Sequence, residues 1–506
     1  MRELLLGIDI GTSACKVAAF ERDGTVAASA TGDYQVEYPQ KGWAQQRAED
    51  WYAGVCAALA KIWAEGKVQP EEITGIGIDG LSWAAVPIGA DGTSLYPSPL
   101  WMDTRAASVC ERLRSEIGEE AIFEVAGNPV QPTYTTPKVL WYKEQQPEVF
   151  AKTQKILQSN GYIAYRLTGK FTNDVCNAYG WHCFNMRRGE WDLEMARTMG
   201  IPEHFLPDLV PCDEIVGKVT AQAAKETGLC EGTPVAAGGL DAACGTLGAG
   251  VLHDGETQEK GGQAGGMSIC IEEYNADPRL ILSYHVVPDR WLLQGGTTGG
   301  GGVMRWFEAQ FAGEERLLAK ERGSSSLTQL NEIAAAVPPG CEGVVFLPYM
   351  NGERSPIWDP KAKGVFYGLD FAKTKGHMVR ACMEGVAYSL KHNIDVAEAA
   401  GAKAQVLRAV GGSANSRLWT QIKADITGKK IIVPSSDTAT TLGAAMLAGV
   451  GTGYYQSYEE AVAAAVVDTR EHEPGTDPEV TEAYAKSYQT YRKLYDQLKD
   501  LMDAAY

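Results

Sequence analysis

The sequence is poor in basic residues and has no closely paired cysteines. Lysine and arginine number 46 against 64 aspartates and glutamates, which gives a formal net charge of −18. Such a charge argues against a protein that binds nucleic acid or an anionic membrane surface. The 11 cysteines are scattered, with no Cys-x-x-Cys pair and no zinc-like spacing of Cys and His. We therefore expect reduced thiols, no zinc site and a cytoplasmic protein.

Several familiar segments and motifs are also missing. No stretch approaches 18 uninterrupted apolar residues, so no membrane span is expected. The N-terminal segment MRELLLGIDIG lacks the apolar region and cleavage site of a signal peptide. No G-x-x-x-x-G-K-[ST] occurs, which excludes a P-loop. Gly75-x-Gly77-x-x-Gly80 fits a dinucleotide-binding pattern, but an apolar strand runs through it without opening a helix.

The order of the predicted elements indicates an α/β fold. Residues 3–31 read as three strands, with a hairpin at Asp23-Gly24. Residues 48–66 have helical apolar spacing and a glycine stop, and the next segment returns to strand. Strands that alternate with amphipathic helices are typical of α/β proteins.

The 506 residues are enough for several domains, and we predict two. Residues 232–303 are rich in glycine, and the polar segment HDGETQ at 253–258 is the best boundary. The predicted domains are residues 1–252 and 253–506. A second strand meander follows the boundary, so the halves read as distant copies of one strand-rich unit. From about residue 455 onward the pattern predicts closing helices.

The first strand carries a carboxylate within an apolar run, in LLLGIDIGTSACK. A buried carboxylate is costly unless it is paired. One interpretation is a hairpin in which Asp9 caps the turn. The other is a phosphate-binding turn, in which Gly11, Thr12 and Ser13 present donors, Lys16 adds positive charge and Asp9 orients a hydrated Mg²⁺.

Two further segments permit both a structural and a functional interpretation. Asp241 is the one charged residue in GGLDAACGTLGAG; it is either a helix N-cap or a general base with room for a substrate hydroxyl. In GGSANSRLW, Gly412 and Asn415 stand at the start of a predicted helix. That segment is either a plain strand-to-helix turn or a site for a purine edge or diphosphate.

Seven blocks, taken in order, resemble one family. They are GIDIGTSACKVAAF, PLWMDTRA, GGLDAACG, LPYMNGERSPIWDPKAKGVFYGLD, GHMVRACMEGVAYSL, GGSANSRLWTQIKADITGKKI and TTLGAAMLAG. The chain is similar over roughly residues 4–452 to the FGGY carbohydrate kinases. The resemblance implies two actin/hexokinase/Hsp70-like (ribonuclease H-like) α/β domains with an ATP cleft between them. It also implies transfer of phosphate from ATP to a sugar or polyol hydroxyl.

The resemblance assigns roles to particular residues. It makes Asp241 the catalytic base and Asp9, with Asp241, a carboxylate near Mg²⁺. The nucleotide and phosphate positions that it implies are Gly11, Thr12, Ser13, Lys16, Gly265, Gly266, Gly299, Gly300, Gly412 and Asn415. Many relatives carry Gly-Thr where this chain has Gly265-Gly266, so backbone donors replace a side-chain hydroxyl here.

The substrate side looks most like the xylulokinase branch. That branch usually has Met-His where this chain has Ser82-Trp83. Together with Trp101, Asp103 and Arg105, these residues are expected to line the sugar site, although core packing is the plainer interpretation of Trp83. D-xylulose is the first expectation. The alternatives are ribulose, glycerol, erythritol or gluconate as substrate, or a non-catalytic ATP-binding actin-like module. The family also implies a possible homodimer.

Overall fold

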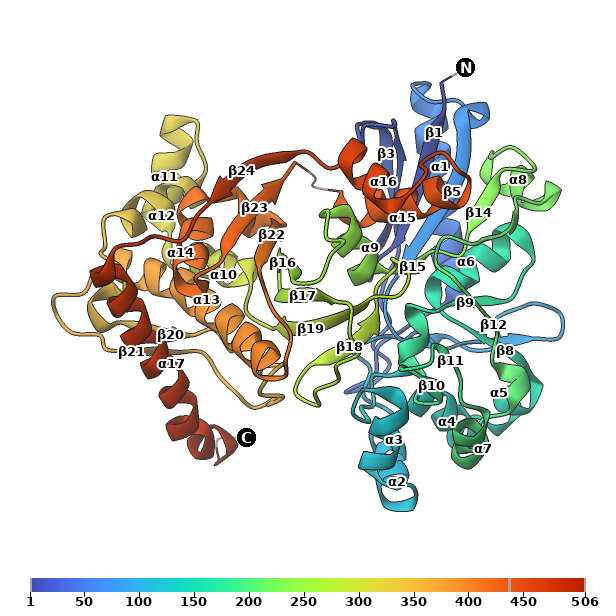
Figure 1. Cartoon of the computed structure of the whole chain (residues 1–506), viewed down its shortest axis with the longest axis horizontal. Helices are drawn as coiled ribbons and strands as arrows, with labels where there is room; N and C mark the ends of the chain where they lie inside the picture. The colour runs from blue at the N-terminus through green and yellow to red at the C-terminus, as the bar shows by residue number, and fades with distance from the viewer. Residues whose placement is uncertain (1, 436–437, 505–506) are drawn as a thin grey trace.

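The chain folds into two lobes, each built on a seven-stranded mixed sheet. The computed structural model describes residues 2–435 and 438–504, so the outer limits of the two predicted domains, residues 1 and 506, lie outside the described residues. In Figure 1 the N-terminal segments, in blue and green, form most of the right-hand lobe, and most of the yellow to red segments form the left-hand lobe. The mixed α/β class expected from the sequence is confirmed.

The first sheet has the strand order β13-β14-β5-β1-β2-β3, and β15 also pairs with β5. Its strands are β1 (Leu4–Ile10), β2 (Ala14–Phe20), β3 (Val26–Asp33), β5 (Ile73–Gly80), β13 (Ile215–Lys218), β14 (Pro234–Ala236) and β15 (Gly239–Leu240). The predicted three-strand meander is therefore confirmed, and Gly24 turns it with φ of 78°. Strand β5 runs through the Gly75–Gly80 pattern, as the sequence predicted.

The second sheet has the order β18-β19-β17-β16-β22-β23-β24. Its strands are β16 (Glu256–Gly261), β17 (Gly265–Ile271), β18 (Ile281–Tyr284), β19 (Trp291–Thr297), β22 (Val406–Val410), β23 (Lys430–Pro434) and β24 (Asp468–His472). Within the second sheet, the run β19-β17-β16-β22-β23-β24 has the same order and the same strand directions as the run β3-β2-β1-β5-β14-β13 in the first sheet. The two halves thus share one sheet topology, as the sequence pattern indicated.

Short two-stranded sheets extend the first lobe and the loops of the second. They pair β4 (Gln45–Gln46) with β7 (Ser98–Pro99), β6 (Val86–Gly89) with β8 (Thr153–Leu157), β9 (Thr172–Asp174) with β12 (Asp208–Val210), β10 (Phe184–Asn185) with β11 (Glu190–Trp191), and β20 (Val345–Leu347) with β21 (Val365–Tyr367).

Helices cover both sheets. Those of the first half are α1 (Ala48–Glu65), α2 (Ala107–Glu116), α3 (Glu119–Ala126), α4 (Thr135–Gln145), α5 (Pro147–Lys152), α6 (Ser159–Thr168), α7 (Leu193–Met199), α8 (Ala221–Thr227) and α9 (Asp241–Gly248). Helix α1 matches the predicted helix: Trp51, Val55 and Leu59 are fully buried on its core face. Gly66 ends it in the left-handed conformation with φ of 69°.

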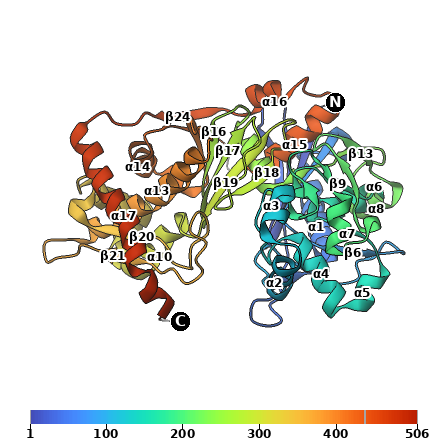
Figure 2. The same ribbon diagram turned by 60° about the horizontal axis from the view of Figure 1, so that its bottom comes forward.

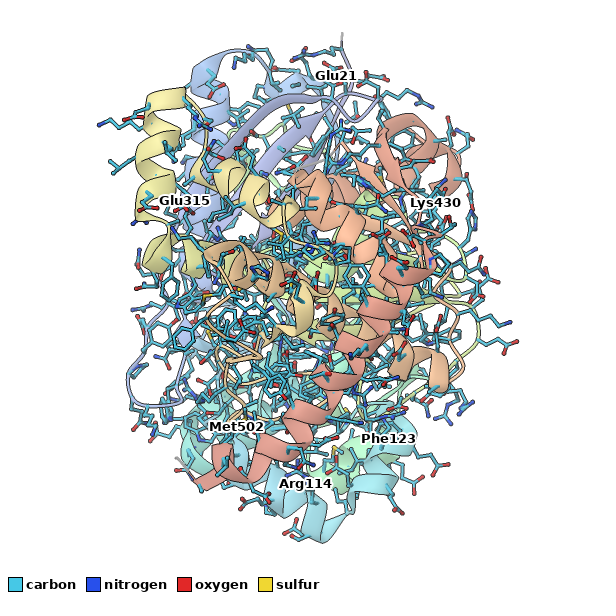
Figure 3. The ribbon with its side chains drawn as sticks, turned by 90° about the vertical axis from the view of Figure 1, so that its left-hand side faces the viewer. Glu21, Arg114, Phe123, Glu315, Lys430 and Met502 are labelled. Atoms are coloured by element: carbon cyan, nitrogen blue, oxygen red, sulfur yellow. The ribbon has the colours of Figure 1, made fainter. Side chains whose placement is uncertain are left out.

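The second half contributes α10 (Gly301–Phe311), α11 (Gly313–Arg322), α12 (Ser326–Ala335), α13 (Lys375–Ala399), α14 (Arg417–Thr427), α15 (Ala439–Gly451), α16 (Tyr458–Ala465) and α17 (Pro478–Ala504). The predicted closing helices are α16 and α17; strand β24 lies between them, which the sequence analysis did not anticipate. Helix α17 crosses the outer face of this lobe, with Met502 near its end, while α11, with Glu315, stands at the opposite edge (Figure 3). In the described residues no helix has the length and apolar character needed to cross a bilayer.

The chain returns to the first lobe near its end. Helix α15 packs on α9, β1 and β5, and both Figure 1 and Figure 2 show α15 and α16 beside the N-terminal strands. The contact is close because it is made by glycines. A Cβ atom on Gly248 of α9 would lie 1.8 Å from the Ala439 carbonyl oxygen, and one on Gly443 of α15 would lie 1.8 Å from the Cys244 carbonyl oxygen. Side chains at these positions would force the two helices apart.

Candidate active site

Three aspartates lie at the carboxyl ends of neighbouring elements of the first sheet. Asp9 of β1 and Asp79 of β5 are direct partners in a parallel pair. On the other side of β5, Gly239 pairs with Asp79, and Asp241 begins α9 two residues later. Because parallel strands end at one edge of a sheet, the three carboxylates are brought together where α/β proteins place their ligands. The sequence analysis assigned Asp9 and Asp241 to this site and gave Asp79 no role.

Burial dominates the electrostatics of these carboxylates. It raises the pKa of Asp9 to about 6, and it also raises the pKa values of Asp79 and Asp241. Asp79 is fully buried. Neither of its carboxylate oxygens has a hydrogen-bond partner among the described residues, and the negative charge of Asp9 raises the pKa of Asp79 further. The three groups therefore resist being ionised together.

Lys260, which belongs to the second lobe, offsets the repulsion among the three aspartates. It is exposed at the end of β16, and its charge lowers the pKa values of all three aspartates. Lys16 acts on Asp9 in the same direction, as its direct partner across β1 and β2. The sequence analysis found Lys16 but missed Lys260. The signal that was available is its place as the last but one residue of the strand that enters the second glycine turn, as Asp9 is of the strand that enters the first.

Asp241 starts its helix instead of capping it. The N-cap is Leu240, whose side chain makes no capping hydrogen bond, and the Ala242 N–H donates to Asp241 Oδ1 at 2.6 Å. The N-cap interpretation is therefore wrong by one residue. One carboxylate oxygen is held at the helix N-terminus, where negative charge is stabilised.

The turn between β1 and β2 is held by contacts on both sides. The Gly11 N–H donates to the Ala14 carbonyl at 3.1 Å, and the Tyr34 hydroxyl donates to the Gly11 carbonyl at 2.7 Å. The Trp101 indole N–H donates to Thr12 Oγ1 at 3.1 Å. Trp101, predicted for the sugar side, thus contacts the predicted phosphate turn. Ser13 is exposed at the tip of the turn.

Glycines in the second lobe allow two chain segments to touch. Gly299 and Gly300 lie between β19 and α10. A Cβ atom on Gly300 would lie 2.3 Å from the Ala264 carbonyl carbon, and one on Gly299 would lie 2.3 Å from the Pro348 carbonyl oxygen. A side chain at either position would separate this segment from its neighbour. The structure therefore brings together the predicted glycines at 265–266 and 299–300.

The backbone around Gly266 leaves little room for a side chain, so a larger residue there would require the neighbouring strand to shift slightly. A Cβ atom on Gly266 would lie 3.0 Å from the Gly295 carbonyl oxygen. A hydroxyl close to Gly265 is that of Thr297 on the paired strand, whose Oγ1 lies 2.6 Å from the Cβ position of Gly265. The Thr297 hydroxyl donates to the Gly299 carbonyl at 3.2 Å. It therefore stabilises the glycine segment.

A cavity of about 390 Å³ opens beside these glycines. It lies between the β16–β17 turn at Gly261, the start of α10, helix α12 and the 3₁₀ turn Gly412–Asn415. This volume lies within the range of about 300–1,000 Å³ that is usual for small-molecule sites. Of the two residues predicted for the adenosine segment, Gly412 lines the cavity, whereas Asn415 is exposed at the end of its turn and does not line it. Arg305 and Asn331 line it and were missed.

A buried ion pair fixes one wall of this cavity. Lys423 Nζ donates to Glu259 Oε1 at 2.7 Å and to Ser413 Oγ at 2.8 Å. Both charged side chains are almost completely buried. Since Ser413 lines the cavity and Glu259 is in β16, Lys423 ties the 3₁₀ turn to the sheet. Ser416 then caps α14 by accepting from the Trp419 N–H at 3.1 Å.

The predicted sugar side is a cluster of aromatic rings. Trp83 stacks on Tyr134 with ring centroids 4.3 Å apart and contacts Tyr179 at 5.6 Å. Its φ is 60°, a strained value for a residue with a side chain. Its indole N–H is buried without a hydrogen-bond partner in the described chain. The Tyr179 hydroxyl donates to Ser82 Oγ at 3.2 Å. Trp83 therefore packs in the core and also retains an unused donor.

Asp103 and Arg105 are placed beneath this surface. Arg105 Nη2 donates to Asp103 Oδ2 at 2.8 Å, and both side chains are 0% exposed. The guanidinium stacks over Trp43 at 3.9 Å, and the Ala44 N–H donates to Asp103 Oδ2 at 2.6 Å. The structure thus gives this pair a role in holding the wall, and their direct contact with a sugar stays a prediction.

The donors at the site suit a hydrated Mg²⁺ better than a protein-enclosed metal. No group of three or more His, Cys, Asp or Glu is arranged to hold a metal ion within residues 2–435 and 438–504. Mg²⁺ in phosphate-transferring sites usually keeps several waters and takes one or two carboxylates together with substrate phosphates. Asp9 and Asp241 are the two carboxylates predicted for this role, and each is only partly buried.

Comparisons with known proteins agree with this geometry. The FGGY family of carbohydrate kinases matches with its N-terminal domain at residues 4–248 and its C-terminal domain at residues 272–452. A xylulose kinase of Bacillus subtilis is 32% identical over 502 residues, covering 99% of this chain and 98% of that protein. A gluconokinase of Bacillus subtilis is 29% identical over 510 residues, covering 100% of this chain and 97% of that protein.

A solved structure gives the same answer. The crystal structure of xylulose kinase from Rhodospirillum rubrum superposes with a TM-score of 0.88 at 30% sequence identity, covering 99% of this chain and 100% of the other. The two matched domains account for most of the sequence and include Asp9, Asp79, Asp241 and the glycines at 299–300. Lys260 and the Gly265-Gly266 segment lie between the two matches. The chain belongs to the FGGY family of carbohydrate kinases and is a sugar kinase that uses ATP.

Proposed function

We propose that this kinase transfers the γ-phosphoryl group of MgATP to D-xylulose and forms xylulose 5-phosphate. The observation that supports a neutral sugar is the aromatic cluster around Trp83, with its unused indole donor. An indole N–H can donate to a hydroxyl or carbonyl oxygen of a ketose, and aromatic faces pack well against the C–H surface of a sugar.

The positively charged side chains beside this cluster, Arg105 and Lys138, already have partners within the protein. Arg105 pairs with Asp103 under the surface. Lys138 donates to the Trp83 carbonyl at 2.8 Å, and burial lowers the pKa of its ammonium to about 7. A carboxylate substrate such as gluconate would therefore meet no uncommitted positive charge from these residues. This observation favours a ketose over gluconate, although a gluconokinase is among the relatives. Ribulose, glycerol and erythritol remain the neutral alternatives.

The chain's own groups account for the transfer. Asp241 is the proposed general base that accepts the proton of the attacking hydroxyl. Lys16, Lys260 and the N–H groups of the glycine segments would orient the phosphates and stabilise the charge that develops on them. Mg²⁺, held by Asp9 and Asp241, would neutralise charge on the phosphates. The cavity beside Gly412 would take the adenosine.

The direct test is ADP release from MgATP against a panel of ketoses, aldoses, polyols and gluconate. We expect the highest kcat/KM for D-xylulose and background release with gluconate. A preference for gluconate would contradict the inference that Arg105 and Lys138, which already have partners, cannot bind a substrate carboxylate. Intact ATP binding with no turnover on any compound would instead favour the non-catalytic ATP-binding alternative. The expected cytoplasmic location and homodimer stay predictions, which fractionation and light scattering can check.

A further inference from the structure

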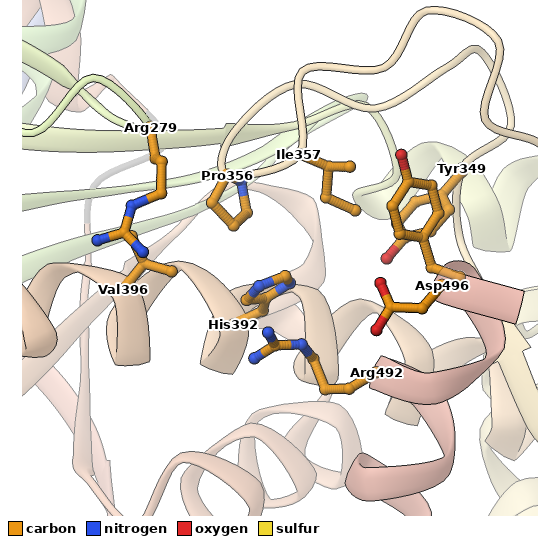
Figure 4. A pocket seen from close by; sticks show the side chains of 9 residues that line it. Arg279, Tyr349, Pro356, Ile357, His392, Val396, Arg492 and Asp496 are labelled. Atoms are coloured by element: carbon orange, nitrogen blue, oxygen red, sulfur yellow. The ribbon is translucent and has the colours of Figure 1, made fainter. Parts of the chain in front are cut away.

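A second cavity, of about 220 Å³, lies in the C-terminal lobe between α13, α17 and the loop at 349–357 (Figure 4). Its walls include Arg279, His392 and Arg492, and its other end is formed by Tyr349 and Asp496. The cavity is smaller than the usual range of about 300–1,000 Å³ for drug-sized ligands, so its occupant would be small. It shares no lining residue with the nucleotide cavity.

Positive charge is concentrated at one end of this cavity. In Figure 4 the guanidinium group of Arg492 lies just below His392, and that of Arg279 lies to its upper left. Arg492 forms no ion pair with any described carboxylate; its Nη1 has only the Tyr488 hydroxyl, at 3.4 Å. Arg279 is shared with Asp277, at 2.7 Å. An uncommitted guanidinium beside a second one is the arrangement that binds phosphate oxygens with charge-assisted hydrogen bonds.

His392 adds hydrogen-bonding capacity without a competing contact. It is 9% exposed, and its ring makes no hydrogen bond within the described residues. Burial and then the charge of Arg492 lower its pKa to about 3, against a smaller opposing effect of Asp395, so the ring is neutral at physiological pH. A neutral imidazole donates one hydrogen bond and accepts another. At the far end, Asp496 can accept from ligand hydroxyls, and Pro356 and Ile357 form an apolar wall.

The loop that forms this wall also holds the nucleotide segment. Ser355, which precedes Pro356, accepts from the Gly296 N–H at 2.5 Å and donates to the Gly296 carbonyl at 3.1 Å. Glu353 accepts from the Thr298 N–H at 2.8 Å. These contacts end one residue before the predicted phosphate-binding glycines at 299–300. Movement of the cavity wall would therefore be transmitted to the nucleotide site.

We propose that this cavity is a regulatory site for a small phosphate monoester that carries hydroxyl groups. Its phosphate would lie between Arg492 and Arg279 against His392, and its hydroxyls would face Asp496. The bound ligand would alter nucleotide affinity through Ser355 and the 296–300 segment. This inference concerns a different cavity from the one used for the proposed function and does not depend on which sugar is phosphorylated.

The test is calorimetric titration of the full-length protein, with its active site first saturated with MgADP and substrate sugar. Glycerol 3-phosphate and inorganic phosphate are the two probes, because they share the phosphate and differ in the hydroxyl-bearing body. We expect glycerol 3-phosphate to bind more tightly than inorganic phosphate. Loss of the Arg492 contact in Arg492→Ala should weaken binding by roughly 10- to 100-fold, whereas Arg492→Lys should retain part of it.

Lys493→Ala is the matched control, because Lys493 is an exposed cation next to Arg492 that does not line the cavity. It should bind both probes like the wild type. No heat with either probe at millimolar concentration, or equal affinity in the wild type and Arg492→Ala, would overturn the site. If Lys493→Ala and Arg492→Ala lost affinity for the probes equally, binding would reflect general attraction to the positively charged surface, which would also overturn the proposed site. Binding that leaves the KM for ATP unchanged would overturn the regulatory part.

Discussion

The two lobes share a sheet topology but have opposite chemistry at equivalent turns. In the first lobe, Asp9 stands one residue before the last residue of β1 and reaches the active site. In the second, Lys260 stands at the same place in β16. The first sheet adds two more carboxylates, while the second contributes glycines and an apolar cavity. One fold thus places carboxylates at the turn of one lobe and a lysine at the equivalent turn of the other, and the charge of that lysine lowers the pKa values of the carboxylates.

The largest effect is expected from removing the base in the acidic lobe. Asp241→Asn keeps the size of the side chain and abolishes its ability to accept a proton. We expect kcat to fall by roughly 10²- to 10⁴-fold, the usual contribution of a general base. ADP release and calorimetric MgATP binding should be measured together. Full turnover in this variant would exclude Asp241 as the base, whereas lost ATP binding would indicate a damaged site.

The next prediction tests whether the charge of Lys260 in the second lobe sets the pKa values of the aspartates in the first lobe. Lys260→Met removes the cation that lowers the pKa values of the three aspartates. The pKa of Asp9, about 6 in the intact protein, should rise. The carboxylate would then form only at higher pH, so the acid limb of the kcat/KM profile should move upward in pH.

We also expect Lys260→Met to raise the KM for ATP by roughly 10- to 100-fold, through loss of a charge-assisted phosphate contact. Lys218→Met, at an exposed strand position in the first sheet, is the control. An unchanged pH profile in Lys260→Met would refute electrostatic coupling between the lobes.

A smaller effect should come from the glycine segment of the second lobe. Gly300→Ala would place a Cβ atom 2.3 Å from the Ala264 carbonyl carbon. Overpacking of this kind costs about 1–3 kcal/mol, and here it would also displace the nucleotide segment. We expect weaker ATP binding with a modestly lower Tm. Gly313→Ala, where no atom lies within 4 Å of the new Cβ, should leave both unchanged.

The smallest expected effect concerns Asp79. An acid whose pKa is higher in the folded state than in the unfolded state binds more protons when folded, so its contribution to stability is lost as pH rises above its ordinary pKa. The pKa of Asp79 is raised in this direction. Asp79→Asn, which copies the protonated form, should therefore increase stability by about 1 kcal/mol at pH 8 and by less at pH 5. Urea denaturation at both pH values measures the difference, and a larger gain at pH 5 would contradict the assignment.

Local patterns in the sequence were sufficient for much of the fold. The first meander follows from apolar runs broken by Asp23-Gly24, and α1 follows from its apolar spacing and Gly66. Strand β24 was missed because it is a charged edge strand whose pairing with β23 no local pattern reveals.

The site was predictable where one short segment carries its chemistry, and less so where distant segments meet. The family blocks located Asp9, Asp241 and the glycines. Lys260 acquires its importance only from the approach of the two lobes, and Asp79 from its register with Asp9. The sequence also did not predict the burial of Arg105, because the residues that enclose it come from separate segments.

Helix α9 gives the protein a narrow mechanical tolerance. It is only eight residues long, from Asp241 to Gly248. Its first residue is the proposed base, and its last lies against the backbone of α15 from the far end of the chain. A short rigid element of about 12 Å, at 1.5 Å per residue, therefore joins the helix crossing to the proposed base. A side chain larger than hydrogen at Gly248 or Gly443 would shift α9 against α15 and displace the Asp241 carboxylate with it.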